Sequence, residues 1–191
     1  METDRKTVIA DAAIALLGSA GAKGLTHRAV DAQAGLPLGS TSFYCRTRSE
    51  LLTLTLLRHA ALDLQDLQAD AQKMARSDWR LDDFIGLLAE RVADWLSASK
   101  RARLAARFEL FLMASRDPDL AAIVTQQRQH FLLATEAALS KAGVQAPATI
   151  APMLVGMIDG ILIDQLGANG PLLSAAQQKA MFRMVLSKGA P

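Results

Sequence analysis

The sequence predicts an all-α fold of about nine helices, and three observations carry this prediction. The 191 residues include 35 alanines and 30 leucines, which are both strong helix formers. Valine and isoleucine number only 7 and 8, and aromatic residues make up 5%, a composition that disfavours β-sheet. Glycines and prolines then divide the chain into segments of helical length.

The N-terminal segment predicts one helix followed by two short ones. The first carries apolar residues at helical spacing and ends among the glycines of residues 18–24, near Gly21. Thr26 is a good N-cap for a short helix over residues 27–34. A second short helix fits residues 40–45.

A long helix begins at Arg48, because Thr47 and Glu50 have the Thr-x-x-Glu spacing of a capping box. Further on, Asp117 is placed to cap a helix whose first turn holds Pro118. The breaks at 76–82, 117–118, 143–147 and 167–171 separate the remaining helices, which fit residues 81–98, 101–116, 118–142, 147–166 and 174–188.

Charge, cysteine content and hydropathy narrow the compartment. The net charge of +2 says little about partners, so a basic surface would have to be local. One cysteine, Cys45, excludes an intrachain disulfide and a paired-thiol zinc site, and we expect it to be a small buried side chain. The most apolar stretch, residues 153–166, carries two aspartates and is too short to span a bilayer. We expect a soluble cytoplasmic protein without a membrane partner.

Residues 25–44 carry the functional signal. Two short helices meet at a turn containing Gly35, where a glycine accepts positive φ, and Leu36 is placed to pack between them. The second helix is polar and small, which suits a helix lying in the major groove of DNA. Three arginines against one aspartate give residues 26–48 a local charge of +2. Geometry alone is equally compatible with an ordinary helical hairpin.

Residues 5–52 resemble the DNA-binding domain of TetR-family transcriptional regulators. The shared anchors are 24–26 (Gly-Leu-Thr), 34–36 (Ala-Gly-Leu), 39–41 (Gly-Ser-Thr), Tyr44 and 47–52. The rest of the chain resembles the family only in length and helix content. The resemblance implies a helix-turn-helix DNA-binding domain over residues 1–47 and an effector-binding and dimerisation domain over 48–191.

The same resemblance assigns the DNA contacts. The first helix of the motif approaches phosphate, the second enters the groove, and Tyr44 and Arg48 clamp the backbone. The implied set is Thr26, His27, Arg28, Leu38, Gly39, Ser40, Thr41, Ser42, Tyr44 and Arg48. The sequence departs from the family at three positions: Ser42 replaces a frequent Tyr, Cys45 a frequent Phe, and Asp31 a small apolar residue.

In the second domain the family arrangement implies a space between helices for a mainly apolar effector with one polar end. The candidate lining residues are Asp66, Trp95, Arg107, Phe108, Phe111 and His130, with Arg107 or His130 meeting the polar end. Two helices also carry larger apolar faces than one domain needs. They predict a homodimer interface made by Met153, Met157, Ile161, Met181, Met184 and Val185.

Other polar groups have plainer interpretations. His59, Asp63 and Asp66 share a helix face, where a metal site is conceivable but a solvated face is expected, because only one histidine is present. His130 lies beside Phe131, which favours a core histidine over a ligand donor. Catalytic motifs are absent from the sequence, so we expect no enzyme activity, no cofactor and no metal.

The sequence therefore predicts a dimeric, ligand-responsive transcriptional regulator. A repressor that binds a palindromic operator and is released by a small-molecule effector is the preferred interpretation. The alternative is an all-helical ligand-binding or assembly module without sequence-specific DNA binding. An all-helical enzyme is a further alternative.

Overall fold

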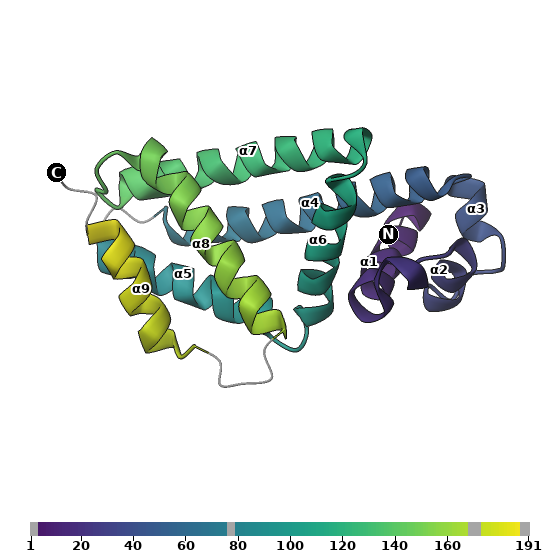
Figure 1. Ribbon diagram of the computed structural model, residues 1–191, viewed down its shortest axis with the longest axis horizontal. Coiled ribbons are helices and arrows are strands. Elements are labelled where there is room, and N and C mark those ends of the chain that lie inside the picture. Colours follow the sequence, from purple (N-terminus) through teal and green to yellow (C-terminus); the bar gives the residue numbers. More distant parts are fainter. Residues whose placement is uncertain (1–3, 76–78, 168–172, 188–191) are drawn as a thin grey trace. The chain divides into compact units, whose positions relative to one another are not determined.

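The computed structural model describes residues 4–75, 79–167 and 173–187. Within these ranges the chain is all-helical and has no strand, which confirms the predicted fold class (Figure 1). The nine helices described are α1 (Arg5–Gly24), α2 (His27–Gln33), α3 (Ser40–Tyr44), α4 (Arg48–Lys73), α5 (Leu81–Leu96), α6 (Arg101–Ala114), α7 (Pro118–Lys141), α8 (Pro147–Gly167) and α9 (Ala175–Ser187). Residue 188 of the last predicted helix, residues 76–78 of the predicted break at 76–82 and residues 168–171 of the break at 167–171 lie outside the described residues.

Local capping sets the starts of α2, α4 and α7, as the sequence predicts. Thr26 Oγ1 accepts a hydrogen bond from the backbone N–H of Ala29 at 3.1 Å. At α4, Thr47 Oγ1 accepts from the N–H of Glu50 at 3.1 Å, and the Glu50 carboxylate accepts from the N–H of Thr47 at 3.2 Å. Asp117 accepts from two N–H groups at the start of α7. These bonds satisfy helix N–H groups that have no partner within the helix.

The glycines at the end of α1 have two different roles. Gly21 has φ 63° and bends the helix, in agreement with a predicted end near this residue. The sequence interpretation placed a helix end at Gly18. In the structure, Gly18 lies inside α1. A Cβ at Gly18 would lie 1.9 Å from the carbonyl oxygen of Ala102 in α6. Glycine at this position therefore allows α1 and α6 to come into close contact.

The chain divides into two compact units. Unit 1 comprises residues 1–64 and 98–126, and unit 2 comprises 65–97 and 127–191. Unit 1 thus groups α6 with the three N-terminal helices. The predicted domain boundary at residue 47 separates two functions, and the division by packing does not test it. It therefore stays a prediction. The core of unit 1 is one apolar cluster that includes Ile9, Leu17, Leu51, Leu56 and Leu110.

Unit 2 is built from α5, α8, α9 and the C-terminal parts of α4 and α7. Its buried side chains include Phe84 and Ile85 on α5, Leu154 on α8 and Phe182 on α9. Among the described helices, α8 alone is long and apolar enough to cross a membrane, judged by length and composition, and it exceeds the stretch of 153–166 considered above. Core helices of soluble proteins pass the same test, so this is weak evidence for a membrane span.

Candidate DNA-binding and effector sites

A buried carboxylate organises the junction between α2 and α3. Asp31 on α2 accepts hydrogen bonds from the backbone N–H of Gly39 at 2.7 Å and of Thr41 at 2.7 Å, and from the Thr41 hydroxyl at 2.6 Å. Gly39 has φ 93°, a conformation that side chains beyond glycine rarely adopt. The aspartate that departs from the family pattern is therefore the group that holds the first turn of α3.

The charge on Asp31 is stabilised in this position. Burial alone would raise the pKa of Asp31, but the hydrogen bonds from Thr41 and Gly39 outweigh it and leave the pKa below its ordinary value. A carboxylate at a helix N-terminus also interacts favourably with the helix dipole. The start of α3 is therefore fixed relative to α2.

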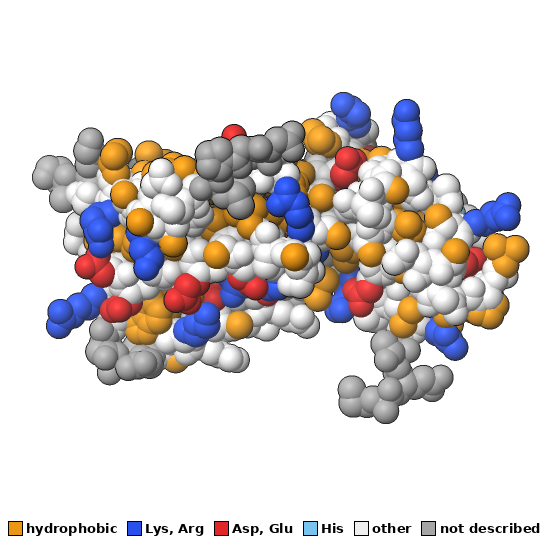
Figure 2. Space-filling view, turned by 90° about the horizontal axis from the view of Figure 1, so that it is seen from below, with side chains coloured by type: hydrophobic (Ala, Val, Ile, Leu, Met, Phe, Trp, Pro, Cys, Tyr) orange, Lys and Arg blue, Asp and Glu red, His pale blue; other side chains and the backbone are white. Residues whose placement is uncertain are grey.

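Several predicted DNA-contacting residues lie on the surface around α2 and α3. Arg28 and Ser42 are exposed, Leu38 is 73% exposed and Tyr44 is 37% exposed. Figure 2 shows basic and apolar side chains next to each other at the end of unit 1 that holds these helices. Such a surface offers charge to phosphates and apolar contact to base methyl groups.

Other predicted contacts have roles inside unit 1. Thr41 is fully buried against Asp31, so its side chain is not part of the surface. The Nε2 of His27 lies 2.8 Å from the carbonyl oxygen of Cys45. Arg48 donates to the carbonyl oxygens of Leu25 and, at 2.6 Å, of Ala22, and so ties the start of α4 to the end of α1.

The remaining predicted contacts lie at the helix starts. Thr26 caps α2, Ser40 donates its hydroxyl to the carbonyl of Pro37 at 2.6 Å, and Gly39 contributes only backbone. Cys45 is 3% exposed, as predicted, and burial raises the pKa of its thiol.

Phe43 is a candidate contact that the sequence interpretation missed. Its ring is 79% exposed on α3 and lies edge-on to the ring of Tyr44, with centroids 5.1 Å apart. A large apolar side chain standing between Ser42 and Tyr44 on a polar helix is a signal that the sequence did carry. Exposure of this size costs the free protein hydrophobic free energy, which contact with a partner can recover.

The histidine on α4 is buried, contrary to the expected solvated face. His59 and Asp63 are 1% and 2% exposed, and Nδ1 of the ring lies 3.3 Å from the carboxylate. The ring Nε2 lies 3.1 Å from the carbonyl oxygen of Arg103, whose guanidinium donates to Asp63 at 2.9 Å. Helical periodicity failed here because α6 covers this face of α4. Within the described residues, no group of three His, Cys, Asp or Glu is placed to hold a metal.

Asp63 is ionised within this cluster. Burial raises the pKa of Asp63, but the neighbouring His59, Arg107 and Arg103 outweigh this effect and lower the pKa to about 2. The hydrogen bond from Arg103 to Asp63 links α6 to α4 within unit 1, and removal of one partner would leave the other charge without compensation.

The six predicted effector residues are divided between the two units. Arg107, Phe108 and Phe111 belong to unit 1, where the Arg107 guanidinium lies 5.3 Å from the centre of the Phe111 ring. In unit 2, the Trp95 indole donates to Asp66 at 2.9 Å. His130 is exposed, so the expected core histidine is wrong: it occupies the outer face of α7.

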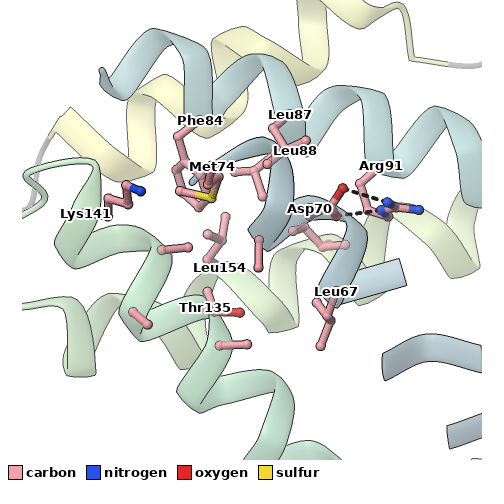
Figure 3. Close-up of a pocket in the computed structure, with 15 residues that line it drawn as sticks. Leu67, Asp70, Met74, Phe84, Leu87, Leu88, Arg91, Thr135, Lys141 and Leu154 are labelled. Atoms are coloured by element: carbon pink, nitrogen blue, oxygen red, sulfur yellow. Dashed lines mark hydrogen bonds and ion pairs between the residues drawn. The ribbon is translucent and has the colours of Figure 1, made fainter. Parts of the chain in front are cut away.

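Unit 2 instead contains an apolar cavity of about 280 Å³, lined by none of those six residues (Figure 3). Side chains from α4, α5, α7 and α8 surround it. Most are apolar, including Leu67, Met74, Phe84, Leu87, Leu154 and Ile158. The charged lining residues are Asp70, Arg91 and Lys141. Cavities with this composition are typical sites for small apolar molecules with one polar group.

A second hollow in unit 2 is polar. It is lined by side chains that include Trp79, Asp82, Glu90 and Lys73. Lys73 lies 3.6 Å from Glu90, and Asp82 lies 2.6 Å from Arg183, so these charges are already matched at the surface. The apolar cavity is therefore the better candidate for an effector.

The comparison with known families finds a match in the C-terminal part of the chain. Residues 79–188, more than half of the chain, match the model of the tetracyclin repressor-like C-terminal domain. The chain belongs to the TetR family. None of the curated proteins matches it in sequence.

Solved structures of TetR-family proteins share the fold over nearly the whole chain. A family member from Streptomyces coelicolor is 27% identical, with a TM-score of 0.75 over 96% of this chain and 99% of that one. The multidrug binding protein EbrR, in complex with ethidium, is 26% identical, with a TM-score of 0.72 over 97% and 99%. A transcriptional regulator from Rhodococcus is 18% identical, with a TM-score of 0.78 over 96% and 95%, and shows the fold alone.

The predicted dimer residues of this TetR-family chain divide by exposure. Met153 and Met184 are 58% and 61% exposed, and Met157, Met181 and Val185 are half-buried. Ile161 is 5% exposed, so its side chain is buried within the protomer. The sequence missed Ile163, which is 48% exposed on α8.

Proposed function

We propose that this TetR-family regulator is a cytoplasmic transcriptional repressor that binds a palindromic operator as a homodimer and is released by a small molecule. The observation that carries the proposal is the exposed surface of α2 and α3, whose recognition helix is fixed by Asp31. The alternative is a helical ligand-binding or assembly module that no longer reads DNA.

The DNA contacts we propose are those that combine exposure with suitable chemistry. Arg28 offers charge to phosphate or a base edge, and Ser42 offers a hydroxyl. Leu38 and Phe43 offer apolar contact to thymine methyl groups, because both are more than 70% exposed. In this proposal Thr41, His27 and Arg48 keep these groups in place.

The cavity of unit 2 is the effector site in this proposal. EbrR, a structural relative, has been solved with ethidium, malachite green and proflavin. An effector that binds one conformation of the dimer better than the other would shift the population away from the DNA-binding form. An apolar cavity of about 280 Å³ is at the lower end of the range for small-molecule sites.

The homodimer interface we propose is the outer face of α8 together with Met184 of α9. Met153 and Ile163 are exposed there, and a Cβ at Gly156 or Gly160 would meet no atom within 4 Å. An apolar face of this kind on a soluble protein is a typical interaction surface. Two-fold pairing would present two recognition helices to two half-sites.

Selection of bound sequences from a random DNA pool tests the DNA-binding role. We expect an enriched palindrome whose half-sites are about one helical turn or more apart. Binding to a labelled enriched fragment should survive excess competitor DNA at two salt concentrations. If binding disappears with competitor and falls only with salt, the protein attracts the backbone without reading sequence, and the helical-module alternative holds.

Sedimentation tests the interface. Met153→Glu should convert the dimer to monomer at micromolar concentration, because it places an unpaired charge in an apolar contact. The matched control is Leu133→Glu on α7, since Leu133 is also exposed, at 64%. A Met153→Glu variant that remains dimeric would move the interface elsewhere.

A further inference from the structure

The cavity of unit 2 has two charged regions of different character. Figure 3 shows Asp70 and Arg91 on one side and Lys141 on the opposite side, with apolar side chains between them. A ligand that fills the apolar space can therefore place a polar group near one region or the other. Which region accepts it depends on whether the charges there are already neutralised.

At the Arg91 side one guanidinium faces three carboxylates, so the negative charges there outnumber the positive one. Arg91 donates to Asp70 from Nε at 2.8 Å and from Nη2 at 2.6 Å, and from Nη1 to Asp94 at 2.6 Å. The Asp66 carboxylate lies 3.5 Å from Nη1. The hydrogen bonds that Arg91 donates to Asp70 raise the pKa of Arg91, so the guanidinium stays charged.

This arrangement disfavours an anionic ligand group at the Arg91 side. All three guanidinium nitrogens already have a carboxylate or backbone acceptor, and three carboxylates surround them, so the anionic group of a ligand would be repelled. A cationic ligand group would compete with Arg91 for Asp70, with which Arg91 forms a bidentate pair, one of the stronger side-chain interactions.

Lys141, at the opposite side of the cavity, differs from Arg91 in its exposure and in its ion pairs. Its side chain is exposed, and in Figure 3 its nitrogen points towards the region of Phe84 and Met74. It makes no ion pair with any residue in the part of the chain that the structure describes. Lys141 also occupies the last turn of α7, where a cation interacts favourably with the helix dipole. If stabilising the helix were its only role, replacement of Lys141 would leave ligand binding unchanged.

We infer that the cavity binds a small amphiphilic anion, with its apolar body between the helices and its carboxylate at the Lys141 ammonium. This inference rests on the proposed function, since it names the chemical class of the effector. It separates this chain from a relative solved with dyes such as ethidium, which carry positive charge.

Calorimetric titration with three compounds of one skeleton tests the inference. The probes are 4-phenylbutanoate, 4-phenylbutan-1-ol and 4-phenylbutylammonium, which share an apolar body and differ in the head group. We expect the carboxylate to bind about three- to fivefold tighter than the alcohol, as for an ion pair near the surface, and the ammonium to bind weakest. Added salt should reduce the preference.

Two lysine variants locate the effect. Lys141→Met should lower the affinity for the carboxylate to that for the alcohol and leave the alcohol unchanged, which shows that the cavity remains intact. Lys73→Met is the matched control, because Lys73 occupies the last turn of α4 in unit 2 and does not line the cavity. It should keep the preference for the carboxylate.

Three results would overturn the inference: tightest binding of the ammonium, a carboxylate preference that persists in Lys141→Met, or binding of none of the three probes. Operator binding, measured in parallel, keeps the proposed function separate. If the carboxylate binds through Lys141 and operator affinity does not change, the site stands and the effector role fails. If other compounds release the operator and the carboxylate does not bind, the inference fails and the proposed function stands.

Discussion

In unit 1, a Cβ at Gly18 would lie 1.9 Å from a carbonyl oxygen, whereas in unit 2 a Cβ at Gly86 would meet no atom within 4 Å. The surroundings of the charged groups also differ between the two units. Asp31 and Asp63 of unit 1 are enclosed by their partners, while the charged groups of unit 2 line a cavity. Unit 1 thus fixes a surface, and unit 2 leaves space for a ligand.

The largest effect is expected at Asp63, where the charge is buried. Asp63→Ala should lower the free energy of unfolding by about 3–5 kcal/mol, because it leaves the partners of a buried pair uncompensated. Asp11→Ala is the control: Asp11 pairs with Arg58 at 2.7 Å but is 47% exposed, so the loss should stay below about 1 kcal/mol. Urea unfolding of both variants measures the difference.

The pH dependence of unfolding checks the same group. The pKa of Asp63 is lowered to about 2 in the folded protein, so its stabilisation is present above pH 4 and is lost as the pH falls towards 2. Asp63→Ala should lose less stability over this interval than the wild type. If the free energy of unfolding falls equally with pH in the variant and the wild type, ionisation of Asp63 does not contribute to stability.

The second contrast is steric. Gly18→Ala should destabilise unit 1 by about 2–3 kcal/mol, because backbone must move to admit the methyl group. Gly86→Ala on α5 should instead stabilise by about 0.5–1 kcal/mol, since alanine favours the helix and the space is open. Thermal unfolding that moves in the same direction for both variants would contradict the contrast between the units.

Asp31→Asn tests whether the junction of α2 and α3 supports the surface. An amide in place of the carboxylate turns a donor towards Gly39 or Thr41, so we expect a loss of about 1–3 kcal/mol in stability. DNA affinity should fall as well, because the start of α3 is no longer fixed. If the variant is destabilised but binds DNA with unchanged affinity, the hydrogen bonds of Asp31 to the start of α3 are not needed for DNA recognition.

The smallest expected change in stability comes from the exposed surface. Phe43→Ala and Arg28→Ala should each weaken operator binding by about 1–3 kcal/mol. Unfolding should remain nearly unchanged, because Phe43 is 79% exposed and Arg28 is exposed. Fluorescence anisotropy with a selected operator measures the affinity. Wild-type affinity in both variants would remove the proposed DNA surface.

The sequence predicted those parts of the fold that depend on local interactions. Thr26, Thr47 and Asp117 cap helices through bonds that span two or three residues, and such spacings are visible in the chain. The bond from Asp31 to Thr41 spans ten residues, and that from His59 to Arg103 spans 44. Contacts of this range depend on how helices pack, which periodicity does not give.

The effector site shows the same limit. Periodicity and family analogy chose bulky residues such as Trp95 and Phe111, but size does not tell which side chains face a common space. The cavity is lined mainly by smaller apolar side chains at the C-terminal ends of α4 and α7 and on α5 and α8. His130 was misplaced because its apolar neighbour Phe131 points inward while His130 occupies the outer face.

We propose that ligand binding in the cavity of unit 2 controls DNA binding by unit 1, and a linkage titration measures this coupling. The dissociation constant of the selected operator is measured with and without saturating 4-phenylbutanoate, and that of 4-phenylbutanoate with and without operator. If the two sites are coupled, operator and 4-phenylbutanoate should weaken the binding of each other by the same factor, about 5- to 150-fold. An operator dissociation constant that does not change when the cavity is saturated would contradict it.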